Sequence, residues 1–292
     1  MNLDKNKKLV LSIALNVLLA LALSILLYLV YPQFIYKLES VENFRSYSVR
    51  TYRNWDNGTA YFEVLLGPED RDREPQVQRR VYSYSGEVAF FVETFGADVT
   101  GDGVPDLVIQ QWNGSASERG SRYFVLELNG STVKEIAVIE GLAAVKRKDV
   151  NGDGVDELVG YDEAYRSFGG CCCADSPCPR VVLSFDRTLR KFALNKKLMA
   201  KPPLSEEQLY GLSLTYKDDP GWADEVLPPP GLFRTMFDLI YNGNEKQAWE
   251  LLDASWPDGC EFSKQEWKRD VEDALRRSPY SPVAGAASSR DD

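Results

Sequence analysis

The sequence predicts a mainly β protein with an N-terminal transmembrane helix and a small α-helical unit at its C-terminus. Three observations support this prediction. Residues 9–31 are almost entirely apolar, residues 41–197 alternate short β-rich segments with turn residues, and residues 204–280 change to the helical spacing of apolar side chains. We expect the β-rich segments to fold as blade-like meanders of adjacent antiparallel strands.

The composition excludes some classes of function. The 292 residues carry a formal net charge of −10, whereas proteins that bind nucleic acid need a basic surface, so we expect no nucleic-acid partner. The chain contains no histidine. This removes Ser-His-Asp and Cys-His nucleophiles, haem attachment and the usual catalytic zinc sites. We therefore do not expect an enzyme.

Residues 9–31 have the length and composition of a membrane-spanning helix. Three polar residues, Ser12, Asn16 and Ser24, interrupt the apolar run, and its length suffices to cross a hydrocarbon core of about 30 Å. A cleaved signal peptide is the alternative, because Ala20-Leu21-Ala22 looks like a cleavage site, but the apolar run continues beyond it. We expect an uncleaved single-pass anchor, with residues 1–8 in the cytoplasm.

Segments rich in β-branched and aromatic residues predict strands after this anchor. They group into three meanders of about 50 residues each. The predicted strands are residues 61–66, 77–84 and 88–94 in the first meander, 107–111, 123–128 and 133–139 in the second, and 158–161, 181–185 and 191–194 in the third.

Two acidic loops of the same design predict calcium binding. The loops start at Asp98 and Asp149, and in both an oxygen-bearing side chain occupies positions 1, 3, 5 and 9. Ca²⁺ takes about six to eight oxygen ligands, and a tight loop with alternate side chains turned inward supplies most of them, with the carbonyl at position 7 adding another. The expected ligands are Asp98, Thr100, Asp102, Val104 and Asp106 in the first loop, and Asp149, Asn151, Asp153, Val155 and Glu157 in the second.

An EF-hand opens in the same way, but it needs a Glu at position 12 and flanking helices. Here position 12 is Ile109 in one loop and Gly160 in the other, and both loops run into short apolar segments that predict strands. The core D-x-[DNT]-G-D-G-x-x-[DE]-L and the strand after it resemble the FG-GAP/VCBS repeat family, the calcium-loop β-repeats of integrin α-chain propellers. The resemblance covers these loops and their adjoining strands.

This resemblance implies a propeller-like fold with Ca²⁺ as a structural ion. A closed propeller takes about four to eight blades, so three meanders predict a partial or open array, or an assembly in which copies complete one another. We expect the ion to pin each loop between strands, so that its loss loosens the β region without stopping a reaction.

Five cysteines predict a disulfide in an oxidising compartment. Cys171, Cys172, Cys173 and Cys178 share one loop of the third meander, and Cys260 lies near the C-terminus. The simplest hypothesis pairs Cys178 with one of the triplet, leaving Cys260 paired to another or free. A Cys₄ metal site or a redox pair is the alternative, although consecutive residues point to opposite sides and C-x₂-C spacing is absent.

The C-terminal part predicts a small helical unit over residues 204–280, followed by a disordered tail over 281–292. Helices are expected at residues 205–212, 232–241 and 245–255, and a fourth starts at the capping box Ser263-Lys264-Gln265-Glu266 and ends near residue 277. We expect Trp249, Trp256 and Trp267 to form the core of this unit. A peptide-binding groove is the alternative.

These features predict a membrane-anchored binding or scaffolding module of the cell envelope. Calcium at micromolar to millimolar concentrations and cysteine oxidation both favour a soluble part outside the cytosol, in the periplasm or on the cell surface. The expected partner is an envelope protein or a second copy of the chain. The alternatives are an envelope enzyme or thiol redox factor that uses the Cys171–Cys178 loop, and an accessory subunit of a membrane complex.

Overall fold

The computed structural model describes most of the chain, in two compact units. Unit 1 comprises residues 1–90 and unit 2 residues 91–292, so the boundary lies within the β-rich part of the sequence. The described residues are 15–25, 36–54, 56–67, 79–87, 89–112, 121–166, 168, 176–224, 228–258 and 263–283.

The structure corrects the prediction of a transmembrane helix over residues 9–31, and with it the membrane anchor. Within the described residues, no helix is both long and apolar enough to cross a membrane. Residues 15–25 are helical. Residues 9–14 and 26–31 of the predicted span lie outside the described residues.

Unit 1 contains an antiparallel sheet whose four strands follow chain order. The strands are β1 (Tyr36–Phe44), β2 (Tyr47–Asn54), β3 (Thr59–Leu66) and β4 (Arg79–Glu87). Val49 of β2 faces Val64 of β3 across the ladder, and both are fully buried, as is Phe62. Phe62 meets Phe90 edge to face, with ring centroids 5.1 Å apart. The sequence predicted β3 and β4 but missed β1 and β2.

The second and third sheets are also antiparallel meanders of four strands each. The second sheet consists of β5 (Ala89–Ala97), β6 (Asp106–Trp112), β7 (Arg122–Asn129) and β8 (Thr132–Glu140), and the third of β9 (Leu142–Lys148), β10 (Glu157–Asp162), β11 (Arg180–Asp186) and β12 (Lys191–Leu194). In both sheets an acidic loop joins the first two strands.

The mainly β architecture with C-terminal helices is therefore as predicted, but the grouping of strands was wrong. The segment 88–94 was assigned to the first meander, and it is the start of the second sheet. Strand β9, which opens the third sheet, was not predicted at all. The second and third sheets thus each begin with the strand before their acidic loop.

Helices form the C-terminal part of unit 2. They are α2 (Lys196–Met199), α3 (Glu206–Lys217), α4 (Pro230–Tyr241), α5 (Glu245–Ser255) and α6 (Lys264–Arg277), with the 3₁₀ turns η1 (Glu163–Tyr165) and η3 (Pro220–Asp224). Ser205 starts α3 by a reciprocal capping box with Gln208. Ser263 accepts a hydrogen bond from the N–H of Glu266 and starts α6 where the sequence predicted.

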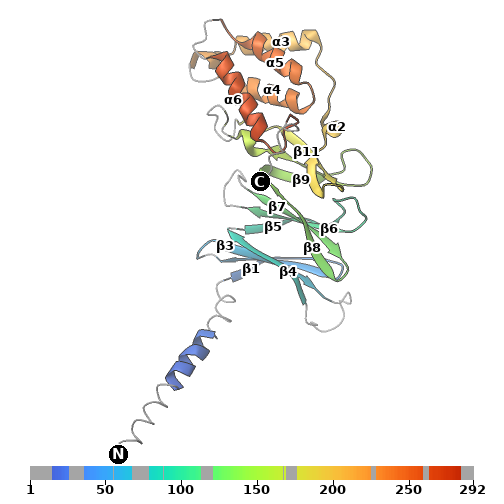
Figure 1. Ribbon diagram of the computed structural model, residues 1–292, viewed down its shortest axis with the longest axis vertical. Helices are drawn as coiled ribbons and strands as arrows, with labels where there is room; N and C mark the ends of the chain where they lie inside the picture. The colour runs from blue at the N-terminus through green and yellow to red at the C-terminus, as the bar shows by residue number, and fades with distance from the viewer. Residues whose placement is uncertain are drawn as a thin grey trace, which may run out of the picture. The chain divides into compact units, whose positions relative to one another are not determined.

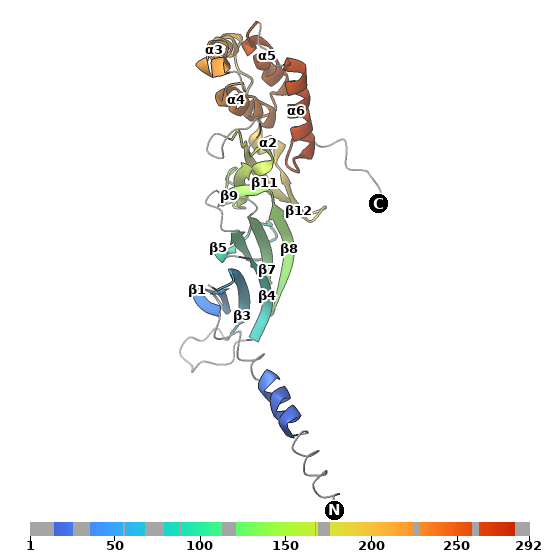
Figure 2. The ribbon, with the colours of Figure 1, turned by 90° about the vertical axis from the view of Figure 1, so that its left-hand side faces the viewer.

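One hydrophobic core continues from the two sheets of unit 2 into its helices. Phe233 of α4 stacks on Trp267 of α6, with ring centroids 4.7 Å apart. Tyr165 of η1 lies 4.2 Å from Phe237 of α4, again between ring centroids. Figures 1 and 2 show α3, α4, α5 and α6 lying together beside β9 and β11. The helices therefore share their core with the third sheet.

The three predicted core tryptophans have different positions. Trp256 and Trp267 belong to this core, and Trp249 packs against it from a partly buried position. The core around these tryptophans also extends beyond the helices, because residues of β9, β10 and β11 are part of the same cluster.

Candidate functional site

The first acidic loop closes on its own backbone. Asp98 Oδ1 accepts hydrogen bonds from the N–H groups of Gly101 at 2.5 Å and Asp102 at 3.2 Å, and its Oδ2 accepts one from Gly103 at 2.7 Å. Gly101 and Gly103 have φ angles of +73° and +84°, in the left-handed region that favours glycine. The loop geometry is thus set by an aspartate and two glycines.

Asp106, the ninth residue of this loop, is fully buried. Its Oδ2 accepts hydrogen bonds from the N–H groups of Val99 at 2.8 Å and Thr100 at 3.1 Å, whereas its Oδ1 has no hydrogen-bond partner among the described residues. Burial raises the pKa of Asp106 to about 7, the two backbone hydrogen bonds oppose the shift, and the charges of Asp98 and Asp102 add to it.

The second loop repeats the backbone closure with different side-chain contacts. Asp149 accepts hydrogen bonds from the N–H groups of Gly152 at 2.6 Å and Gly154 at 3.0 Å. The bond from Gly154 is the main reason why the pKa of Asp149 is lowered. The side-chain nitrogen of Asn151 donates to Asp153 at 2.8 Å and lies 3.4 Å from Glu157 Oε1.

Both valines that were expected to offer a carbonyl oxygen take part in the loops through their N–H groups. Val104 donates to Asp102 Oδ1 at 2.8 Å, and Val155 donates to Asp153 Oδ1 at 2.9 Å. These are Asx turns, in which a side-chain oxygen receives the N–H two residues later.

The structure corrects the predicted calcium sites. Among the residues it describes, which include both loops in full, no three acidic, histidine or cysteine side chains gather into a group able to hold a metal ion. In the first loop Asp98 and Asp106 accept hydrogen bonds from backbone N–H groups, and in the second loop Asp153 and Glu157 face the side-chain nitrogen of Asn151. The structure therefore does not support the calcium-binding assignment.

The two loops lie next to each other in unit 2. A Cβ placed on Gly101 would come within 3.3 Å of the Val155 side chain and 2.9 Å of Arg187 Nη2. Arg187, in the turn between β11 and β12, also places its Nε 3.4 Å from the carbonyl oxygen of Thr100. The first loop is therefore fixed by its neighbours as well as by its own hydrogen bonds.

The predicted disulfide is not found in the described residues. Cys178 is the one cysteine of the five that the structure describes. Cys171, Cys172, Cys173 and Cys260 lie outside the described residues. The structure therefore does not support the disulfide prediction among the residues that it describes.

A buried carboxylate that the sequence reasoning missed joins the third sheet to the helices. Asp162, at the end of β10, is fully buried. Its Oδ2 accepts hydrogen bonds from the hydroxyls of Tyr241, at 2.6 Å, and Ser278, and its Oδ1 accepts one from the N–H of Ala164 at 2.9 Å. The Tyr165 hydroxyl lies 2.9 Å from the Tyr241 hydroxyl. We call this set of residues the Asp162 network.

Burial is the largest cause of the pKa shifts in the Asp162 network. It raises the pKa of Asp162, and the hydrogen bonds from Ser278, Tyr241 and Ala164 oppose the shift. It also raises the pKa of Tyr241 and Tyr165, with the Asp162 charge adding to both shifts. The two phenols therefore remain protonated and act as hydrogen-bond donors around the carboxyl group.

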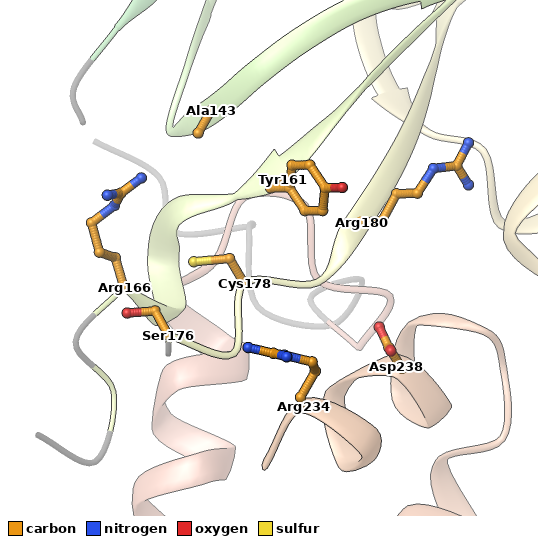
Figure 3. Close-up of a pocket in the computed structure, with 8 residues that line it drawn as sticks. All are labelled: Ala143, Tyr161, Arg166, Ser176, Cys178, Arg180, Arg234 and Asp238. Atoms are coloured by element: carbon orange, nitrogen blue, oxygen red, sulfur yellow. The ribbon is translucent and has the colours of Figure 1, made fainter. Parts of the chain in front are cut away.

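A pocket of about 440 Å³ opens on the same side of the third sheet as α4. Figure 3 shows Arg234 reaching from α4 toward Cys178, with Arg166 beyond Ser176 and Arg180 beside Tyr161. The complete lining is Ala143, Tyr161, Arg166, Ser176, Cys178, Arg180, Arg234 and Asp238. The pocket combines arginines from three separate segments with one aspartate. No sequence motif indicates this pocket, because its lining side chains come from separate segments of the chain.

No family model, no characterised protein and no solved structure matches this chain in comparisons of sequence and fold. The resemblance of the loops to FG-GAP/VCBS repeats therefore stays a prediction.

Proposed function

We propose that this protein is a binding or scaffolding module without catalytic activity, and that unit 2 presents its helical surface from a fixed β base. The observation that carries the proposal is the Asp162 network. Through it Tyr241 at the end of α4 and Ser278 after α6 both bind the carboxylate at the end of β10.

Two further contacts support a fixed arrangement of helices and sheet. The Tyr280 hydroxyl donates to the carbonyl oxygen of Glu140 at 2.6 Å, which ties the segment after α6 to the end of β8. The apolar core is also continuous across the same region. A surface held in one arrangement loses little conformational entropy when a partner binds, which is the advantage of a preorganised binding module.

Cross-linking of the full-length chain in the cells that produce it tests this proposal. Lys246 on α5 is 90% exposed and is a suitable site for an amine-reactive cross-linker. We expect reproducible cross-links from Lys246 and its helical neighbours to a second protein or a second copy of the chain. Mixing labelled and unlabelled chains separates these two cases.

The control is Phe237→Asp, which places a charge in the core and should unfold the helical part. Cross-links that persist in this variant, or wild-type cross-links confined to single chains, would contradict the proposal.

A further inference from the structure

We propose that the outer edge of β1 pairs antiparallel with β1 of a second copy of the chain, so that the unit 1 sheets of two copies join into one. β1 is the first strand of its four-stranded sheet, and within the described residues β2 is its only neighbour in that sheet. A strand at the edge of a sheet presents unpaired N–H and C=O groups, which can bond to another strand. The proposal does not rest on the scaffolding function, since it concerns unit 1 and not the helical surface of unit 2.

Two apolar side chains of β1 are exposed. Leu38 is 53% exposed and Val41 is 45% exposed. Leu38 lies opposite Tyr52 of β2, and Val41 lies opposite Arg50. Residues two apart on a strand point to the same face, and opposite residues of antiparallel strands share a face. Leu38 and Val41 therefore lie on one face of the sheet, at its edge.

A β-bulge in the middle of β1 makes the arrangement of its side chains symmetric. The register with β2 shifts between Leu38 and Ser40, so that Glu39 is one extra residue. Glu39 Oε1 lies 2.9 Å from Arg53 Nε, and Ser40 Oγ lies 2.8 Å from Thr51 Oγ1. Arg53 and Thr51 are two residues apart and share a face of β2. Glu39 and Ser40 therefore point to one face as well, although they are adjacent.

This arrangement selects one antiparallel register between two copies of β1. The side-chain faces match on both sides of the bulge only when Glu39 of one copy lies opposite Ser40 of the other, with a two-fold axis between them. A bulge normally disturbs pairing at a sheet edge, but in this register the two bulges lie opposite each other and the strands stay in step. The charge of Glu39 at the centre is already balanced by Arg53 of its own chain.

The side chains that meet in this register are complementary. Leu38 of each copy lies opposite Val41 of the other, so the two exposed apolar side chains of one strand both gain an apolar neighbour. Lys37 of each copy lies opposite Glu42 of the other, and both are exposed. Apolar pairs and pairs of opposite charge stabilise neighbouring strands, whereas like charges in opposite positions destabilise them. The sequence of β1 therefore fits a second copy of itself.

Charge reversal in the full-length chain tests this register. Sedimentation of the wild type should show a dimer. Lys37→Glu and Glu42→Lys each place like charges opposite each other at both ends of the paired segment, so each should weaken the dimer about tenfold or more. An equal mixture of the two variants should dimerise about as tightly as the wild type, because one chain then carries only acids at these two positions and the other only bases.

Lys246→Glu is the matched control, since it makes the same change in charge at a 90% exposed position on α5. It should leave the dimer unchanged. Melting curves of the variants should match the wild type, because Lys37 and Glu42 are exposed.

Three results would overturn the proposal. A wild type that stays monomeric up to about 1 mM would leave the edge of β1 open to a strand of another protein. Single variants that dimerise as tightly as the wild type would place the contact on another surface. A mixture that associates no better than either variant alone would exclude the pairing of Lys37 with Glu42.

Discussion

Asp106 and Asp162 are both carboxylates with no exposed surface, but they are held in different ways. Asp106 receives its hydrogen bonds from backbone groups six and seven residues away, and one of its oxygens has no partner among the described residues. Both oxygens of Asp162 accept hydrogen bonds, and two of the donors are side chains 79 and 116 residues away. The first acid shapes its own loop, whereas the second joins two parts of unit 2.

The largest effect is expected for Asp162→Ala. This change leaves the hydroxyls of Tyr241 and Ser278 without their acceptor and opens a small cavity, so it should lower the free energy of unfolding by about 3–5 kcal/mol. Urea unfolding measures it. Asp273→Ala, an exposed acid on α6, is the control. If the two variants lost similar stability, the Asp162 network would not be holding the helices to the sheet.

Asp106→Asn should raise the free energy of unfolding, and the size of this increase should depend on pH. The pKa of Asp106 is raised to about 7 in the folded chain, against about 3.9 for an unperturbed aspartate. Between these values the folded chain holds the proton more tightly, so the stability of the wild type falls as the pH rises from about 4 to about 7. The asparagine of the variant does not ionise, so the stability of the variant does not fall in this way.

At pH 8 Asp106→Asn should therefore be more stable than the wild type by up to about 4 kcal/mol, and by much less near pH 4. Unfolding at both pH values checks this. A stability difference that does not change with pH would show that Asp106 ionises normally.

Tyr241→Phe tests the contribution of a single donor in the Asp162 network. Ser278 and Ala164 still donate to the carboxylate, so the loss should be smaller than for Asp162→Ala, about 1–3 kcal/mol. Tyr210→Phe is the control, because Tyr210 is 65% exposed. Thermal unfolding of the two variants measures the difference, and an equal change in both would contradict the role of Tyr241.

The smallest effect is expected for substitutions at two glycines of the first loop, Gly101 and Gly103. Alanine is strained at both Gly101 and Gly103, since both have positive φ, and each change should cost about 1 kcal/mol for this reason. At Gly101 the added methyl group also meets Val155 and Arg187, whereas nothing lies within 4 Å at Gly103. Gly101→Ala should therefore melt lower than Gly103→Ala. Equal melting points would mean that the loop is shaped by its own residues alone.

Features with a local cause were predictable from the sequence. The strands after each acidic loop follow from short apolar runs such as Leu107-Val108-Ile109, in which Val108 and Ile109 are β-branched. The start of α6 follows from the cap at Ser263. Strand β9 was missed because Ala143, Ala144 and three basic residues dominate it, and such residues favour strands weakly.

Features that depend on long-range contacts were not predictable. Nothing near Asp162 in the sequence indicates that Tyr241 and Ser278 will reach it, and the arginines of the pocket also come from separate segments. The acidic loops led to a wrong prediction of calcium binding for the opposite reason. Their sequence pattern is typical of a calcium loop, but the pattern does not show that backbone N–H groups take up the oxygens of Asp98 and Asp149.

Histidine normally provides the side chain that exchanges a proton in neutral solution, and this chain has none. With its pKa at about 7, Asp106 takes that place. The carboxyl group beneath the loop is thus expected to exchange its proton near neutral pH.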